Sequence, residues 1–171
     1  MSMENNKMDK TLAELAENAF EKYEETKKYF SRLKKKKPKR LDILMQDLHD
    51  DEFSRTDCLT CANCCKTTSP IFTEKDIKRI SKYLKMKEHH FIKQHLLRDS
   101  DDFMVLQSVP CTFLDTDNTC FIYDVRPKAC SEYPHTNRKK FIQLTNLTLK
   151  NTEVCPAVFN IVEKLKRSLP L

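Results

Sequence analysis

The 171-residue chain contains no glycine, and this absence excludes several common classes of enzyme. Walker phosphate loops and dinucleotide-binding turns both need glycines, for tight turns and for the close approach of backbone to phosphate. A Gly-x-Ser-x-Gly nucleophile elbow cannot be built without glycine either. Any catalytic chemistry must therefore come from the cysteines or from a group that they bind.

Long apolar runs are also missing. No stretch approaches the roughly 18 consecutive apolar residues that a membrane-spanning helix requires. The first residues, MSMENNK, lead into a charged helical pattern and not into the apolar segment of a signal peptide. We therefore expect a cytoplasmic protein. In that reducing compartment, clustered cysteines favour metal binding or catalysis over structural disulfides.

Positive charge is concentrated in one segment. Residues 27–40, KKYFSRLKKKKPKR, contain nine Lys or Arg residues and no acid, while the formal net charge of the whole chain is +6. The rest of the chain is therefore mildly acidic, with a formal charge of −3. A solvated helix end is the simplest interpretation. The alternative is a strip that binds an acidic protein, a nucleic acid or a membrane surface.

The apolar pattern predicts several helices. Residues 9–36 carry apolar side chains at three- and four-residue spacing, typical of a long amphipathic helix, which Pro38 then ends. Residues 41–53 predict a second, short helix or a turn that leads into the cysteine cluster. Thr73 followed by Asp76 predicts a capping box at the start of a third. Further helical patterns cover residues 88–97, after a break near Met86, and residues 154–165.

A small, irregular β element is expected between residues 103 and 123. Short β-branched or aromatic runs alternate there with the turn sequence DTDN at residues 115–118. Residues 141–149 predict another strand. The fold class is therefore mainly α with a small irregular β element (α+β). We expect an N-terminal amphipathic helix with its basic run at residues 1–40, and one cysteine-cluster metal-binding domain at residues 41–171.

Eight cysteines are the main chemical feature of the chain. Four lie within the eight residues CLTCANCC, and the other four lie at the boundaries of predicted elements. Two successive C-x-x-C steps are typical of iron–sulfur proteins, and four thiolates around one zinc ion are the other standard arrangement. The candidate metal ligands are Cys58, Cys61, Cys64, Cys65, Cys111, Cys120, Cys130 and Cys155.

The adjacent pair Cys64–Cys65 restricts how these thiols can be shared. In a continuous helix Cys58, Cys61 and Cys65 would share a face while Cys64 pointed aside, and in a strand the two neighbours would face opposite ways. Eight thiolates can hold two four-ligand sites, or one cluster with some cysteines left over. Core filling does not need this spacing, and a thioredoxin-like redox pair normally shows a single C-x-x-C.

The segments CLTCANCC, PCTFLD, CFIYDVRPKACSEYP and VCPA together resemble the YkgJ-type cysteine-cluster family. The resemblance runs from about Cys58 to Pro156 and implies a zinc- or iron-chelating domain with the eight cysteines at motif positions. Two positions depart from the family pattern. Ala62 stands where glycine is common, and Thr112 stands where proline usually follows the cysteine.

A similar cluster is found in flagellin lysine N-methylases, where the metal centre resembles an iron–sulfur cluster. The resemblance therefore implies a zinc or iron cofactor, with a 4Fe-4S cluster as one form. Three function classes stay open: a metal-binding protein of unknown reaction, an iron–sulfur enzyme for redox or methyl-transfer chemistry, and a metal-shaped interaction module that uses its basic helix.

Four residues near the later cysteines are candidates for supporting the site. Arg126 offers a positive charge to anionic thiolates, or pairs with a nearby acid at the surface. Tyr123 and Tyr133 are expected to pack around the site. His135 is the histidine closest to the cluster in sequence, although eight thiols already supply enough donors.

Overall fold

The computed structural model describes residues 3–171, with side chains from Thr11 onward. The chain divides into two compact units. Unit 1 consists of Met1–Cys58 and Pro134–Leu171, and unit 2 of Leu59–Tyr133. The division predicted at residue 40 stays a prediction, and the compact units separate at residues 58 and 133.

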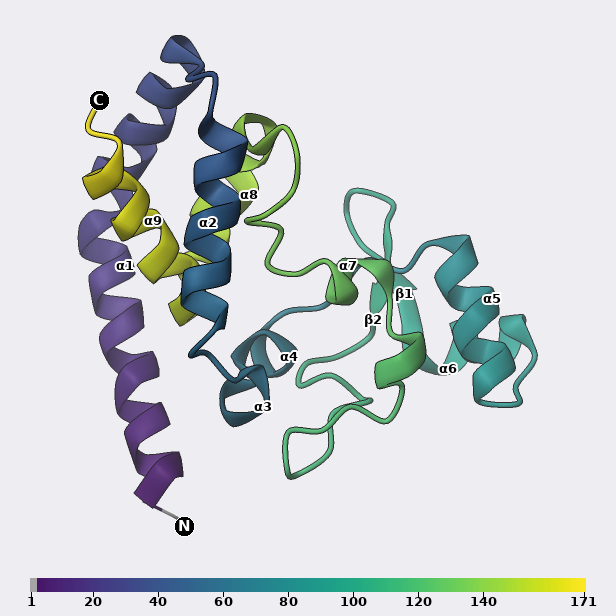
Figure 1. The fold of residues 1–171 in the computed structure, drawn as a ribbon. Coiled ribbons are helices and arrows are strands. Elements are labelled where there is room, and N and C mark those ends of the chain that lie inside the picture. The colour runs from purple at the N-terminus through teal and green to yellow at the C-terminus, as the bar shows by residue number, and fades with distance from the viewer. Residues whose placement is uncertain (1–2) are drawn as a thin grey trace. The chain divides into compact units, whose positions relative to one another are not determined.

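Unit 1 is helical. It contains the long helix α1 (Met3–Lys36), which extends the predicted helix at its N-terminal end, and the predicted helices α2 (Leu41–Phe53) and α9 (Pro156–Ser168). Helix α9 packs against both α1 and α2 (Figure 1). Its first residue is Pro156, which fits this position because the missing N–H would have no partner in the first turn.

The strand predicted at residues 141–149 is wrong. These residues form the 3-10 turn η2 (Phe141–Leu144) and the helix α8 (Thr145–Asn151). In this helix the hydroxyl of Thr145 donates to the Ile142 carbonyl at 3.1 Å, and that of Thr148 to the Leu144 carbonyl at 2.9 Å. Such bonds back to the preceding turn let β-branched residues fit a helix.

Apolar contact between helices forms the core of unit 1. Long side chains of α1 and α2 meet those of η2, α8 and α9 with little or no exposed surface. Burial of such side chains stabilises a fold by about 1.5–3 kcal/mol each relative to exposure. The buried residues are Tyr29, Phe30, Leu33, Leu41, Met45, Phe141, Leu149, Val158, Ile161, Val162 and Leu165.

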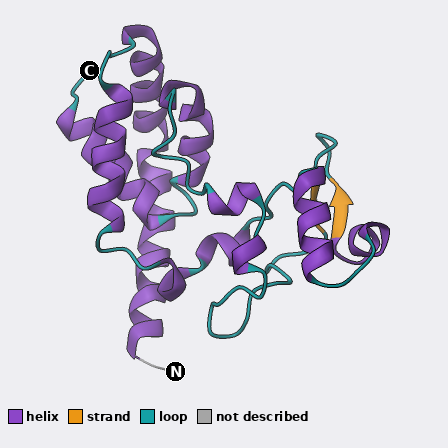
Figure 2. Ribbon diagram, turned by 45° about the vertical axis from the view of Figure 1, so that its right-hand side comes forward, coloured by secondary structure: helices purple, strands orange, loops and turns teal. Residues whose placement is uncertain are grey.

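Unit 2 has a separate, smaller core. Helices α5 (Glu74–Tyr83) and α6 (Glu88–His95) pack with a two-stranded antiparallel sheet of β1 (Leu96–Arg98) and β2 (Met104–Leu106). Leu96 pairs with Leu106 across the sheet, whose strands are orange in Figure 2. The buried residues are Phe72, Ile77, Ile80, Phe91, Leu96, Leu106, Phe113 and Ile122.

These elements confirm the predicted fold class, and the capping box of α5 forms as expected between Thr73 and Asp76. Two local predictions change. Residues 96–97 leave the predicted helix and enter β1. The strands expected on either side of the DTDN turn reduce to one bridge, between Leu114 and Cys120.

Candidate metal centre

The CLTCANCC run folds as two short helical turns. Helix α3 (Cys58–Cys61) lies at the boundary between the units, and α4 (Asn63–Thr67) follows it. Ala62 separates them with φ 47° and ψ 17°, in the left-handed region. The run is therefore neither one helix nor a strand. Glycine would adopt this conformation without the steric cost that Ala62 bears.

A tight hairpin places Cys111 near Cys120. The Phe121 amide donates to the Phe113 carbonyl at 3.0 Å, and the DTDN turn closes the loop with Asn118 at φ 67°. The Cys111 amide also donates to the Cys65 carbonyl at 2.8 Å. This bond fastens the hairpin to α4, so three cysteine-bearing segments meet in unit 2.

Cys130 is held by contacts from α5. It lies on α7 (Lys128–Ser131), and the first amide of that helix, from Lys128, donates to the Asp76 carboxylate at 3.1 Å. Arg79 donates to the carbonyls of Val125 and Arg126 at 3.3 and 2.9 Å. Two side chains of α5 thus fix the loop that carries the fourth thiol.

Asp76 and Arg79 were not predicted to serve the site. The capping box did identify Asp76, which accepts from the amide and hydroxyl of Thr73 at 3.0 and 2.6 Å. Nothing in the sequence shows that its second oxygen binds Arg79 at 2.6 Å and reaches Lys128. That role depends on packing between segments about 50 residues apart.

Four thiols of unit 2 act on one another electrostatically. Burial, followed by the charges of Cys65, Cys111 and Cys120, raises the pKa of the Cys130 thiol to about 12. Burial also raises the pKa of Cys111, with added effects from Cys65 and Cys120. The pKa of Cys120 rises through burial and through Cys65. We call Cys65, Cys111, Cys120 and Cys130 the four-thiol cluster.

Cys65 is the most acidic thiol of this cluster. A hydrogen bond with the Cys64 thiol, at an Sγ–Sγ distance of 4.0 Å, lowers its pKa to about 7 against the opposing effect of burial. Cys64 therefore lies directly beside the cluster. A thiol with this pKa ionises more readily near neutral pH than a free cysteine does.

Hydrogen-bond donors and a cation also face the sulfurs. The amides of Phe113 and Leu114 act on Cys111, and the amide of Ile122 acts on Cys120, in each case lowering the thiol pKa. The charge of Arg126 lowers the pKa of both Cys120 and Cys130. Such contacts stabilise thiolates more than thiols, as the surroundings of metal-ligating sulfurs do.

The predicted supporting residues lie in different places. The guanidinium of Arg126 sits over the Tyr123 ring at 3.9 Å from its centroid and donates to the Tyr123 carbonyl at 2.7 Å. The Tyr133 amide donates to the Cys130 carbonyl at 3.3 Å. His135 belongs to unit 1, with φ 66°, and is outside the four-thiol cluster of unit 2.

The other predicted ligands divide between the units. Cys61 and Cys64 belong to unit 2, while Cys58 and Cys155 belong to unit 1. No disulfide joins any of the eight cysteines. Within residues 3–171, no three His, Cys, Asp or Glu side chains stand in a geometry that would hold a metal ion. A bound cation would therefore have to draw the cluster thiols closer together.

A cation fits the chemistry of these donors. Thiolates are soft ligands that favour zinc, iron–sulfur clusters and Cu(I) over magnesium or calcium. The cluster offers four partly buried sulfurs, amide donors aimed at two of them, and a guanidinium whose charge offsets excess thiolate charge. These residues could hold a metal ion once their thiols lose protons.

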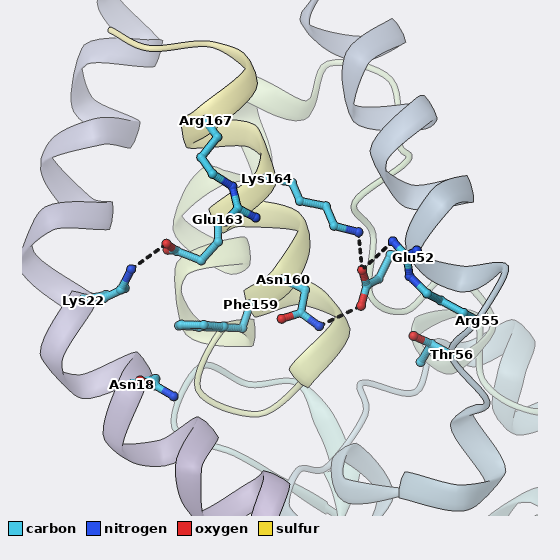
Figure 3. Close-up of a pocket in the computed structure, with 10 residues that line it drawn as sticks. All are labelled: Asn18, Lys22, Glu52, Arg55, Thr56, Phe159, Asn160, Glu163, Lys164 and Arg167. Atoms are coloured by element: carbon cyan, nitrogen blue, oxygen red, sulfur yellow. Dashed lines mark hydrogen bonds and ion pairs between the residues drawn. The ribbon is translucent and has the colours of Figure 1, made fainter.

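Each unit has a cavity that charged residues help to line. One, of about 560 Å³ in unit 1, is lined by residues of α1, α2 and α9 (Figure 3). Its charges are largely paired: Glu52 accepts from Lys164 at 2.7 Å and from Asn160 at 2.8 Å, and Glu163 from Lys22 at 2.8 Å. These bonds join the three helices.

A cavity of about 500 Å³ in unit 2 is lined in part by Asp76, Arg79 and Arg126.

No helix among residues 3–171 combines the length and apolar character needed to cross a membrane.

No solved structure matches the chain. An uncharacterized protein, MJ0661 of Methanocaldococcus jannaschii, is 32% identical over 91 residues, which cover 52% of this chain and 49% of that protein. The chain thus spans about half the length of that curated relative.

The cysteine-bearing part of the chain gives a more specific match. Residues 57–156 match the family model CxxCxxCC, described as "Putative zinc- or iron-chelating domain". The match covers all eight cysteines and more than half of the chain. The protein therefore belongs to the CxxCxxCC family of zinc- or iron-chelating domains.

Proposed function

We propose that this is a cytoplasmic metal-binding protein whose four-thiol cluster forms one complete metal centre for zinc or iron. The observation that carries the proposal is that Cys65, Cys111, Cys120 and Cys130 come together within one compact unit, where the Cys111 amide bonds the Cys65 carbonyl and the four thiols act on one another electrostatically. Four thiolates are the full ligand set of a structural zinc ion or of an iron–sulfur cluster.

The remaining cysteines would serve the centre in another way. Cys64 contacts Cys65 and holds its pKa near 7, so it would tune a ligand or exchange with it. Cys58, Cys61 and Cys155 are candidates for a second metal site or for further ligands of a larger cluster. Arg126 would stabilise the anionic sulfurs, with Asp76 and Arg79 holding the loop between Arg126 and Cys130.

Loading of this centre would release protons. Metals bind the thiolate, and burial keeps Cys130 protonated at neutral pH, with a pKa of about 12. A bound cation supplies the positive charge that makes ionisation of a buried thiol favourable. Metal affinity is therefore expected to rise with pH across the neutral range.

The identity of the metal decides between the function classes. Anaerobic purification, elemental analysis and a visible absorption spectrum would distinguish them. Colourless protein with stoichiometric zinc would support a structural or carrier role and eliminate the redox alternatives. Brown protein with iron and acid-labile sulfide would support an iron–sulfur enzyme, including methyl-transfer chemistry of the kind that the N-methylase resemblance implies.

Serine substitution tests which thiols are ligands. We expect Cys120→Ser and Cys130→Ser each to lower the bound metal at least tenfold, since loss of one thiolate opens the site. Cys155→Ser, in unit 1, is the matched control and should retain metal if the four-thiol cluster is complete. Full metal content in a Cys120→Ser/Cys130→Ser double variant would contradict the proposed ligand set.

A further inference from the structure

Tertiary contacts bring a second group of cations beside the lysine-rich C-terminal end of α1. The Lys34 ammonium donates to the side-chain oxygen of Asn146, on α8, at 2.8 Å. At the start of α2, the Asp42 carboxylate accepts from the amides of Lys140 and Phe141 at 2.7 and 3.0 Å. The end of α1, the start of α2, η2 and α8 therefore meet at one end of unit 1 (Figure 1).

Ten exposed cations gather there from three separate segments of the chain. Only six of them belong to the lysine-rich run that is visible in the sequence. Residues 138–140, with the sequence RKK, and one lysine of α8 supply the others. We call this surface the basic end; it consists of Lys34, Lys35, Lys36, Lys37, Lys39, Arg40, Arg138, Lys139, Lys140 and Lys150.

The basic end is built on the core of unit 1 and is not a loose tail. Leu33, adjacent to the lysine run, is fully buried, and Leu149, adjacent to Lys150, is 8% exposed. Phe30 of α1 meets Phe141 edge-on at a ring-centroid distance of 6.4 Å. Backbone amides donate hydrogen bonds to both oxygens of Asp42. This carboxylate, which lies beside the cations, is therefore already hydrogen-bonded to the backbone.

We propose that the basic end binds the phosphate backbone of duplex nucleic acid without sequence preference. Eight of its ten residues are lysines, which act as point charges toward phosphates. Successive lysines of α1 point about 100° apart, so the charges radiate around the helix end and do not form one flat face. This arrangement suits phosphate rows on either side of a groove better than a planar membrane surface.

The make-up of the basic end also indicates how the nucleic acid is bound. Proteins that bind single strands stack bases on exposed aromatic side chains. Among residues 11–171 the exposed aromatic residues are Phe20, Tyr83, Phe103, Phe121 and Tyr123, and none of these belongs to the basic end. Without stacking side chains, binding through the backbone charge of a duplex is favoured. This inference is independent of the metal at the four-thiol cluster.

The test is a titration of a labelled DNA duplex with the metal-loaded full chain between about 50 and 200 mM salt. Each phosphate-bound lysine adds about one to the negative slope of log affinity against log salt. We expect Lys139→Gln/Lys150→Gln to weaken duplex binding roughly tenfold and to reduce the salt slope by about two. The same effect is expected of Lys35→Gln/Lys36→Gln. Lys78→Gln/Lys82→Gln, on exposed lysines of α5, is the control and should bind normally.

Three outcomes would overturn the inference. Absence of duplex binding at the lowest salt would remove it. Normal binding by Lys139→Gln/Lys150→Gln, with loss only in Lys35→Gln/Lys36→Gln, would show that the sequence run acts alone and that the basic end is not one surface. Tighter binding to anionic phospholipid vesicles, or to an acidic peptide of equal charge, would assign the surface to a different partner.

Discussion

Unit 1 and the cysteine-bearing part of unit 2 are organised by different forces. The core of unit 1 has eleven buried side chains, nine of them on helices of 34, 13 and 13 residues. The thiols of unit 2 lie on helical turns of four or five residues, on a hairpin loop and on loops fastened by hydrogen bonds. Helices this short are not stable alone in water, so the contrast predicts that a bound metal matters far more to unit 2.

Metal removal should produce the largest difference between the units. Chelation is expected to abolish hydrogen-exchange protection around residues 58–67 and 107–133, because structural zinc contributes on the order of 10 kcal/mol in small domains. Protection in α1, α2 and α9 should persist, since their contacts are apolar. Equal loss of protection in both units, or none in either, would contradict a metal requirement specific to unit 2.

A smaller effect is expected from Asp76→Ala, which removes the link between α5 and α7. The carboxylate is 1% exposed and bonds Thr73, Arg79 and Lys128, so its loss should cost roughly 3 kcal/mol and leave those partners unsatisfied. Urea denaturation followed by a probe in unit 2 would measure the cost. Metal affinity should fall as well, since Cys130 would lose its support. Asp124→Ala, at an exposed carboxylate that lines the same cavity of unit 2, is the control and should change little.

The same carboxylate predicts how acid affects unit 2. Burial alone would raise the pKa of Asp76, but its hydrogen bonds from Thr73, Arg79 and Lys128 outweigh burial and hold the pKa below 3.8. The stabilisation from a depressed carboxyl pKa is fully present above the unfolded value and is lost as pH falls through the folded value. Denaturation midpoints of the natural chain should thus decline below about pH 4, and Asp76→Ala should flatten this decline.

The smallest expected effect is a gain in stability. Ala62→Gly removes the left-handed strain between α3 and α4 and should stabilise unit 2 by about 1 kcal/mol. Lys85→Gly, at φ 55° and away from the cysteines, is a comparable strain-relief control. Ala62 is buried, with 6% of its surface exposed. A loss of stability in Ala62→Gly would mean that packing of the Ala62 methyl group stabilises the fold by more than the left-handed backbone conformation destabilises it.

Much of the fold could be predicted because helical periodicity and end signals are local. The apolar spacing of residues 9–36, Pro38 and the Thr73–Asp76 capping box each depend on neighbours within one or two turns. The error at residues 141–149 has a tertiary cause. Phe141 and Leu149 enter the helical core of unit 1, and no strand pairs with this segment in the described structure.

The thiol chemistry, the family and the long helices could be predicted from the sequence alone, because residue type, motif spacing and amphipathic period are properties of short segments. Packing between distant segments brings the Cys111 amide to the Cys65 carbonyl, places Asp76 against the segment that carries Cys130, and holds Lys140 beside the start of α2. Each of these pairs residues far apart in the chain. Their meeting depends on how whole elements pack, which no local pattern encodes.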